Sequence, residues 1–147
     1  MNFEPFDVGL IVSRLQQLVP ELQAVGSAAD YAAVKELRGF RTPSAYVIFS
    51  EETNTGKIPA SVGVTSQEAA VDFGVVLALR NYGDQRGERM ADPARRFIGQ
   101  VRTALIGHKP GKAARVVGWV SGKVLDYDAS VLLFADLYQV HYLLHKE

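Results

Sequence analysis

The sequence predicts an α+β domain in which two main helices pack on one face of a four-stranded, mostly antiparallel sheet. Apolar residues recur at helical spacing near the N-terminus and after residue 92, and they alternate in two long segments, Gln67 to Leu79 and Ser130 to Leu144. Two helices on one face of the sheet is the simplest two-layer arrangement for these elements. Since the chain has 147 residues, 48% of them hydrophobic, a single domain over residues 1–147 is expected.

The first predicted helix begins after Asp7, which can cap it, and its apolar residues recur as far as Val19, before Pro20. This helix is amphipathic, so we expect it to lie on the sheet. The following segment, Ala28 to Leu37, has two interpretations. It can form a short second helix, and an extended conformation around Val34 fits nearly as well.

The first predicted strand is Ser44 to Ser50, which is rich in β-branched and aromatic residues. The polar residues from Glu51 to Gly63 then predict a long loop, and a second polar stretch runs from Asn81 to Ala91. Loops longer than about 12 residues in a compact domain are usually functional or disordered. Both loops are therefore candidates for contacts with other molecules.

The strand between these loops, Gln67 to Leu79, is longer than a single core requires. Its 13 residues would extend over roughly 43 Å. A compact chain of this length has a radius of gyration of only about 15 Å. A sheet that is shared with a neighbouring molecule would explain the length.

The second main helix is predicted to begin at Asp92, a good N-cap before a proline, and to end at Gly107. The segment from Val116 to Leu125 reads as a strand interrupted by two glycines, at positions 118 and 122, as at β-bulges or close backbone contacts. The last strand, Ser130 to Leu144, has two largely apolar faces. It should be central in the sheet or covered by a partner.

Composition excludes several classes of function. Sixteen basic and sixteen acidic residues cancel, so net charge favours neither a phosphate backbone nor an anionic membrane. The absence of cysteine excludes disulfides, thiolate nucleophiles and cysteine-ligated metals. No signal peptide or membrane-spanning run is recognisable, so a soluble, cytoplasmic protein is expected.

Catalytic and metal-binding patterns are also missing. His141 and His145 would share one helix face as a metal pair, but on the predicted strand they lie about 13 Å apart. The segment Gly107 to Lys112 lacks the spacing of a phosphate-binding loop, and no serine has a local histidine and carboxylate partner. We therefore expect no catalytic residue, no cofactor and no metal.

Asp136 interrupts the otherwise apolar last strand. A buried carboxylate must be paired or neutralised. The preferred partner is an arginine of a neighbouring strand or helix, and the alternative is a bridge between subunits. Arginines 86, 89, 95 and 96 lie close in sequence, but acidic residues among them and the lack of interleaved aromatics favour a solvated or protein-facing surface over nucleic acid.

The chain as a whole resembles the tail terminator family of long-tailed bacteriophages and related prophages. The resemblance lies in its size, the opening helix Phe6 to Leu18, the long strand Val71 to Leu77, the helix from Asp92-Pro93 and the paired long strands near the C-terminus. It covers nearly the whole chain.

The resemblance implies a structural protein of the virion tail, assembled in the host cytoplasm. Members of the family form a ring, typically a hexamer, that caps the tail tube, stops its growth and offers a surface to head-completion proteins. The implied partners are further copies of the chain, the tail tube protein and a head-completion or connector protein, with no membrane and no sequence-specific nucleic acid. The family has no residue motif that can be matched here, so the candidate residues for oligomer or tube contacts come from the two polar loops and the last strand: Glu51, Glu52, Asn54, Lys57, Arg86, Arg89 and Asp136.

Two alternatives stay open. One is a small α+β enzyme or ligand-binding domain with its pocket between helices and sheet, for which Asp136 and His141 are the candidate polar residues. The other is a different head-tail connector ring protein of similar build.

Overall fold

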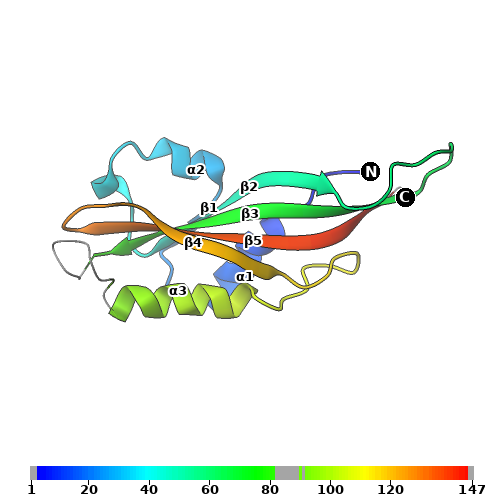
Figure 1. Cartoon of the computed structure of the whole chain (residues 1–147). Helices are drawn as coiled ribbons and strands as arrows, with labels where there is room; N and C mark the ends of the chain where they lie inside the picture. Colours follow the sequence, from blue (N-terminus) through cyan, green and yellow to red (C-terminus); the bar gives the residue numbers. More distant parts are fainter. Residues whose placement is uncertain (1–2, 82–89, 91, 146–147) are drawn as a thin grey trace.

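The computed structural model describes residues 3–81, 90 and 92–145, and in it the chain forms one sheet of five strands in the order β1-β2-β3-β5-β4 (Figure 1). The strands are β1 (Ala24–Gly26), β2 (Ser44–Asn54), β3 (Ser66–Arg80), β4 (Gly118–Tyr127) and β5 (Val131–His145). The helices are α1 (Gly9–Leu18), α2 (Ala28–Ala33) and α3 (Asp92–Leu105), with a short 3-10 helix at Leu37–Gly39. β1 and β2 are parallel, and the other strand pairs are antiparallel.

This architecture confirms the predicted α+β class, and it corrects the predicted number of strands from four to five. The additional strand, β1, has three residues and pairs with Ser44–Tyr46 of β2. Three residues are too few to show a hydrophobic alternation, so the sequence carries no clear sign of this strand.

The two main helices pack together on one face of the sheet, as predicted. The larger core lies there and combines Ile11 and Leu15 of α1, Ile98 and Val101 of α3, and the inward-facing residues of the long strands, such as Phe73. The short α2 lies on the opposite face (Figure 1). A smaller core with residues of β2, β3 and β5 forms under this side of the molecule.

Both interpretations of the segment Ala28 to Leu37 are partly right. Residues 28–33 form α2, and the backbone then becomes extended at Val34, where φ is −87° and ψ is 120°. Tyr31 and Phe40, on either side of this extended stretch, both lie 5.7 Å from the Tyr46 ring, measured between ring centroids. This aromatic cluster fastens the segment to β2.

The predicted helix ends are close to the observed ones. The Asp7 carboxylate accepts a hydrogen bond of 2.8 Å from the Gly9 N–H at the start of α1. α3 starts at Asp92, and Gly107 follows its end with a φ of +83°, a conformation that glycine adopts without strain.

The boundary predicted after Ser50 is wrong, because β2 continues to Asn54 and the loop spans only residues 55–65. Glu51–Asn54 pair with Ala69–Asp72 of β3. This half of β2 is polar because most of its side chains are exposed. A prediction that depends on buried residues therefore ends the strand where burial ends.

The two longest strands run beside each other over their whole length. β3 and β5 have 15 residues each, and their pairing extends from Ser66 opposite His145 to Arg80 opposite Val131. β5 lies between β3 and β4, so the central position is the one of its two predicted positions that the strand order confirms. The strands extend from the end that carries α2 to the end where the loop between β2 and β3 projects (Figure 1). None of the described helices is long and apolar enough to cross a membrane.

Candidate subunit interface

The edge strand β4 is exposed at every one of its ten residues. Among the described strands it pairs only with β5. Its large apolar side chains are Trp119 (44% exposed), Val120 (48%), Val124 (45%), Leu125 (41%) and Tyr127 (45%). An edge strand of this kind offers unpaired backbone N–H and C=O groups and an apolar surface. Both features allow a strand to associate with another chain.

Two β-bulges divide β4. The register with β5 shifts between Trp119 and Ser121 and again between Val124 and Asp126. The four residues from Ser121 to Val124 form a regular ladder between these bulges. Bulges increase the local twist and limit where another strand can pair, so this short piece is the regular part of the edge.

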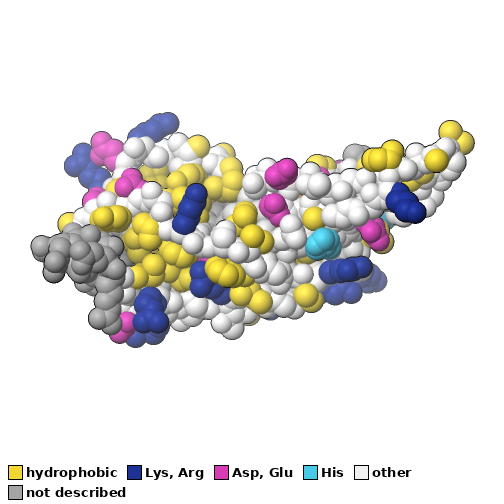
Figure 2. All heavy atoms as spheres, in the orientation of Figure 1, with side chains coloured by type: hydrophobic (Ala, Val, Ile, Leu, Met, Phe, Trp, Pro, Cys, Tyr) yellow, Lys and Arg dark blue, Asp and Glu magenta, His cyan; other side chains and the backbone are white. Residues whose placement is uncertain are grey.

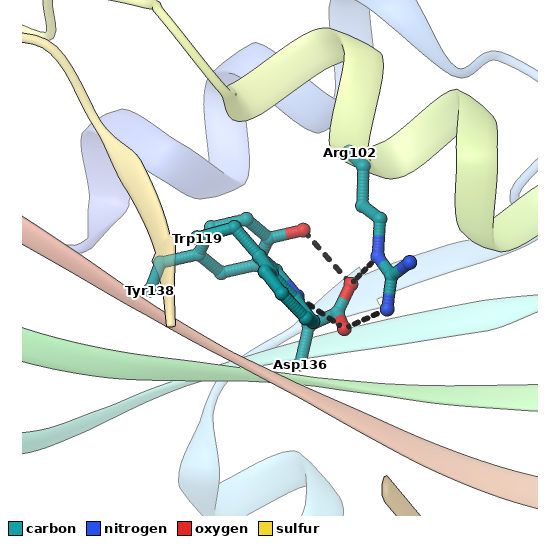
Figure 3. Close-up of polar contacts among 4 residues, drawn as sticks. All are labelled: Arg102, Trp119, Asp136 and Tyr138. Atoms are coloured by element: carbon teal, nitrogen blue, oxygen red, sulfur yellow. Dashed lines mark hydrogen bonds and ion pairs between the residues drawn. The ribbon is translucent and has the colours of Figure 1, made fainter. Parts of the chain in front are cut away.

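A buried carboxylate fixes β4 to the rest of the fold (Figure 3). Asp136 of β5 is only 1% exposed. Its Oδ2 accepts hydrogen bonds from Arg102 Nε at 2.9 Å and from the Tyr138 hydroxyl at 3.0 Å. Its Oδ1 accepts from Arg102 Nη2 at 2.8 Å and from Trp119 Nε1 at 3.0 Å. Residues of α3, β4 and β5 therefore converge on one group.

The packing around this carboxylate is close. The Arg102 guanidinium carbon lies 4.8 Å from the centre of the Trp119 ring, within the range of a cation–π contact. A Cβ atom on Gly122 would come within 2.7 Å of Asp136 Oδ1, so only glycine fits here. Of the two explanations that the sequence offered for Gly122, a bulge or a close contact, the close contact is the one observed. The two bulges of β4 lie at other residues.

The contacts shift the pKa of the two titratable side chains that donate to Asp136, Arg102 and Tyr138. The hydrogen bond with Asp136 raises the pKa of Arg102. Burial raises the pKa of the Tyr138 hydroxyl, and the negative charge of Asp136 raises it further. Arg102 therefore stays protonated and Tyr138 stays neutral over a wide range of pH.

We expect the free energy of unfolding to fall as the pH rises above about 10, by about 1.4 kcal/mol per pH unit for Tyr138 alone. The folded-state pKa of Tyr138 is raised above its unfolded value of 10.0, so the associated stability is complete below that value and is lost as the pH rises toward the folded pKa. Urea unfolding between roughly pH 9 and 11.5 would measure this slope. Tyr138→Phe should have a shallower slope, and equal slopes would contradict the assignment.

The predicted contact residues that the structure describes lie in different surroundings. Glu51 is exposed on β2, and Lys57 is exposed in the following loop. Asn54 Oδ1 accepts a hydrogen bond of 3.0 Å from the Gly56 N–H and so helps to shape the start of the loop. Arg86 and Arg89 lie outside the described residues.

Glu52 and Asp136 have partners within the chain. The Glu52 carboxylate accepts hydrogen bonds from the Phe6 N–H at 2.8 Å and from the Tyr142 hydroxyl. Burial raises the pKa of Tyr142, and its hydrogen bond to Glu52 raises it further. Asp136 pairs with Arg102 of α3, which is the preferred interpretation from the sequence. Both carboxylates therefore hold elements of one subunit together.

The loop at residues 55–65 exposes aliphatic side chains at the projecting end of the molecule (Figure 2). Ile58 is 79% exposed and Val62 is 100% exposed. Isolated exposed apolar residues are common, but two at the tip of one projecting loop form a small apolar contact surface.

Among the described residues, polar side chains do not converge on a catalytic pocket between helices and sheet. His141 lines a hollow of about 490 Å³ with Lys109, Lys112 and Arg115, whereas Asp136 is enclosed by its own partners. His141 and His145 both lie on β5, as the strand interpretation predicted. Within the described ranges, no three histidine, aspartate or glutamate residues are grouped to hold a metal ion.

The apolar surface of β4 was not predictable from the sequence. The segment is predicted as a strand, but nothing in its composition distinguishes an exposed edge from a buried position.

Comparison with known proteins provides an independent observation. A protein-family model described as "Phage tail terminator protein" matches residues 1–147. No curated protein matches the chain.

Proposed function

The chain belongs to the phage tail terminator family, and from this premise we propose that its copies associate through β4 into a closed ring that caps the tail tube. The family is structural, so the chain is a component of the phage tail and the enzyme alternative is decided against. The proposed ring is hexameric, stops polymerisation of the tube and provides the surface for a head-completion or connector protein.

One observation carries the proposal: β4 is exposed over its whole length and carries large apolar side chains. Removing such side chains from water contributes about 25 cal/mol per Å² of apolar surface, a gain from which the entropy lost on association is subtracted. The surface is also held in place, because the Asp136 contacts fix Trp119 to α3 and β5. A head-to-tail contact between this edge and a different surface of the next copy closes into a ring when the rotation between successive copies completes a full turn.

The tube contact is proposed to involve the loop at residues 55–65. It projects from the end of the sheet opposite α2 (Figure 1). Its exposed residues Ile58 and Val62 can insert into an apolar depression of the tail tube protein. The exposed ammonium group of Lys57 beside them supports a contact with a carboxylate of the same partner.

The test combines oligomer mass with tube length. We expect light scattering to give the mass of a closed oligomer and negative-stain images to show rings. When the protein is added to polymerising tail tube protein, tubes should be shorter and should carry a ring at one end. A protein that stays monomeric at high concentration, even beside tail tube protein, would overturn the proposal.

The double substitution Ile58→Asp with Val62→Asp is expected to weaken tube capping at least tenfold while rings still form. Each buried aliphatic side chain contributes about 1.5–3 kcal/mol, and a carboxylate in its place must lose its hydration. Tube length at increasing protein concentration measures the effect. Ser61→Asp, an exposed residue of the same loop, is the control for added charge. Loss of capping by both variants would indicate a charge effect and not an apolar contact.

A further inference from the structure

We infer that neighbouring copies join edge to edge, with β4 of one copy pairing with the outer edge of β2 of the next copy in a continued antiparallel sheet. This inference rests on the proposed ring and adds to it the surface that receives β4. The two edges, their direction and the side chains they carry each support it.

The sheet has two free edges among the described residues. β1 covers only Ser44–Tyr46 of β2, so Val47–Asn54 pair with β3 on one side and with no strand on the other. β4 pairs with β5 and with no other described strand. Outside the sheet, no backbone hydrogen bond among the described residues involves residues 47–54 or 118–126. Both edges therefore have backbone groups available for another strand.

The strand directions suit a ring. β2 is antiparallel to β3, β3 to β5, and β5 to β4, so β2 and β4 run in opposite directions within one copy. Rotation about a ring axis that runs roughly along the strands preserves the direction of every strand. β4 of one copy therefore meets β2 of the next copy antiparallel, the arrangement of the long strand pairs already present in the sheet.

The side chains select one register on each edge. On β2, Phe49 pairs with Phe73 and lies on the side of α1 and α3, where it is 38% exposed. Glu51 pairs with Asp72 and lies on the opposite side. Because the ladder shifts between these two residues, Phe49 and Glu51 occupy successive positions in it.

β4 shows the matching pattern in the regular piece between its bulges. Val124 pairs with Phe134 on the side of α1 and α3, and Lys123 pairs with Ala135 on the opposite side. Antiparallel pairing of Phe49 with Val124 therefore places Glu51 opposite Lys123. One register thus joins apolar with apolar side chains on one face and a carboxylate with an ammonium group on the other.

The same register continues without conflict. The next pairs are Glu52 with Gly122 and Thr53 with Ser121, after which the bulge at Val120 ends the regular piece. Within the described part of the chain, neither Glu51 nor Lys123 forms an ion pair. A β4 to β4 contact between two copies would instead bring like strands together around a two-fold axis and would not build a ring.

Cysteine cross-linking tests the register, because the chain contains no cysteine. Residues directly opposite in antiparallel strands have Cβ atoms about 4.5–5.5 Å apart, close to the separation that a disulfide requires. We expect the double variant Phe49→Cys with Val124→Cys to form a covalent series of oligomers on mild oxidation, which a reducing agent abolishes. The control Phe49→Cys with Lys123→Cys places its thiols on opposite faces and should cross-link at least tenfold more slowly.

Charge exchange gives a second measurement on the unoxidised ring. Glu51→Lys and Lys123→Glu should each reduce ring formation in low salt by about tenfold, and the two together should restore it. Two outcomes would overturn the register while leaving the proposed ring intact. In one, rings form but the Phe49–Val124 and Phe49–Lys123 cysteine pairs cross-link equally fast. In the other, the double charge variant forms rings no better than either single variant. Cross-linking of the single variant Lys123→Cys would indicate a β4 to β4 contact and overturn the register too. A wild-type monomer would overturn the proposed ring itself.

Discussion

Asp136→Asn is expected to lower the free energy of unfolding by about 2–4 kcal/mol, because the buried carboxylate accepts charge-assisted hydrogen bonds that an amide cannot all replace, although water reaches part of the Arg102 side chain. The Asp136 carboxylate accepts four hydrogen bonds, two of them from Arg102. An amide in its place presents an NH₂ group toward donors, so the Arg102 guanidinium and the Trp119 or Tyr138 donor lose an acceptor. The edge strand β4 would then be less firmly held.

Urea unfolding followed by fluorescence measures this effect directly, because Trp119 is the only tryptophan and lies in the affected contact. Asp126→Asn is the matched control, since Asp126 is exposed on the neighbouring strand β4. Its free energy of unfolding should stay within about 0.5 kcal/mol of wild type. Equal stability of Asp136→Asn and wild type would show that the four hydrogen bonds contribute little.

The long strands were predictable because their pattern repeats over many residues. The alternation from Gln67 to Leu79 marks β3 within one residue at each end. The sheet shared with a neighbouring molecule, which its length predicts, stays a prediction. The pairing of Asp136 with an arginine was predictable as well, because burial of an unpaired carboxylate is too costly.

Other features depend on contacts that a linear pattern does not contain. The end of β2 lies beyond Ser50 because hydrogen bonds to β3 hold Glu51–Asn54 in the sheet, although most of their side chains are exposed. β4 has the apolar composition of a buried strand, and only its place in the strand order makes it an edge. The surface proposed for association was therefore invisible until the topology was known.

The second large effect is expected for Val124→Asp, which should weaken association between copies at least about 100-fold, or about 2.7 kcal/mol per contact. Val124 is 45% exposed in the free chain, and the proposed ring covers it. A carboxylate there would be buried without a partner. Because every contact around the ring contains the substitution, micromolar protein should remain monomeric in light scattering.

Ile106→Asp is the matched control, because Ile106 is a β-branched aliphatic residue with a similar exposure of 48% that follows α3 and lies on neither free edge. It should form rings like wild type. Both variants should keep their folded-state stability within about 1 kcal/mol, since the changed side chains are already half exposed to water. Rings of Val124→Asp at wild-type concentrations would exclude β4 as the contact surface, whereas loss of rings in Val124→Asp alone places the subunit boundary at this edge.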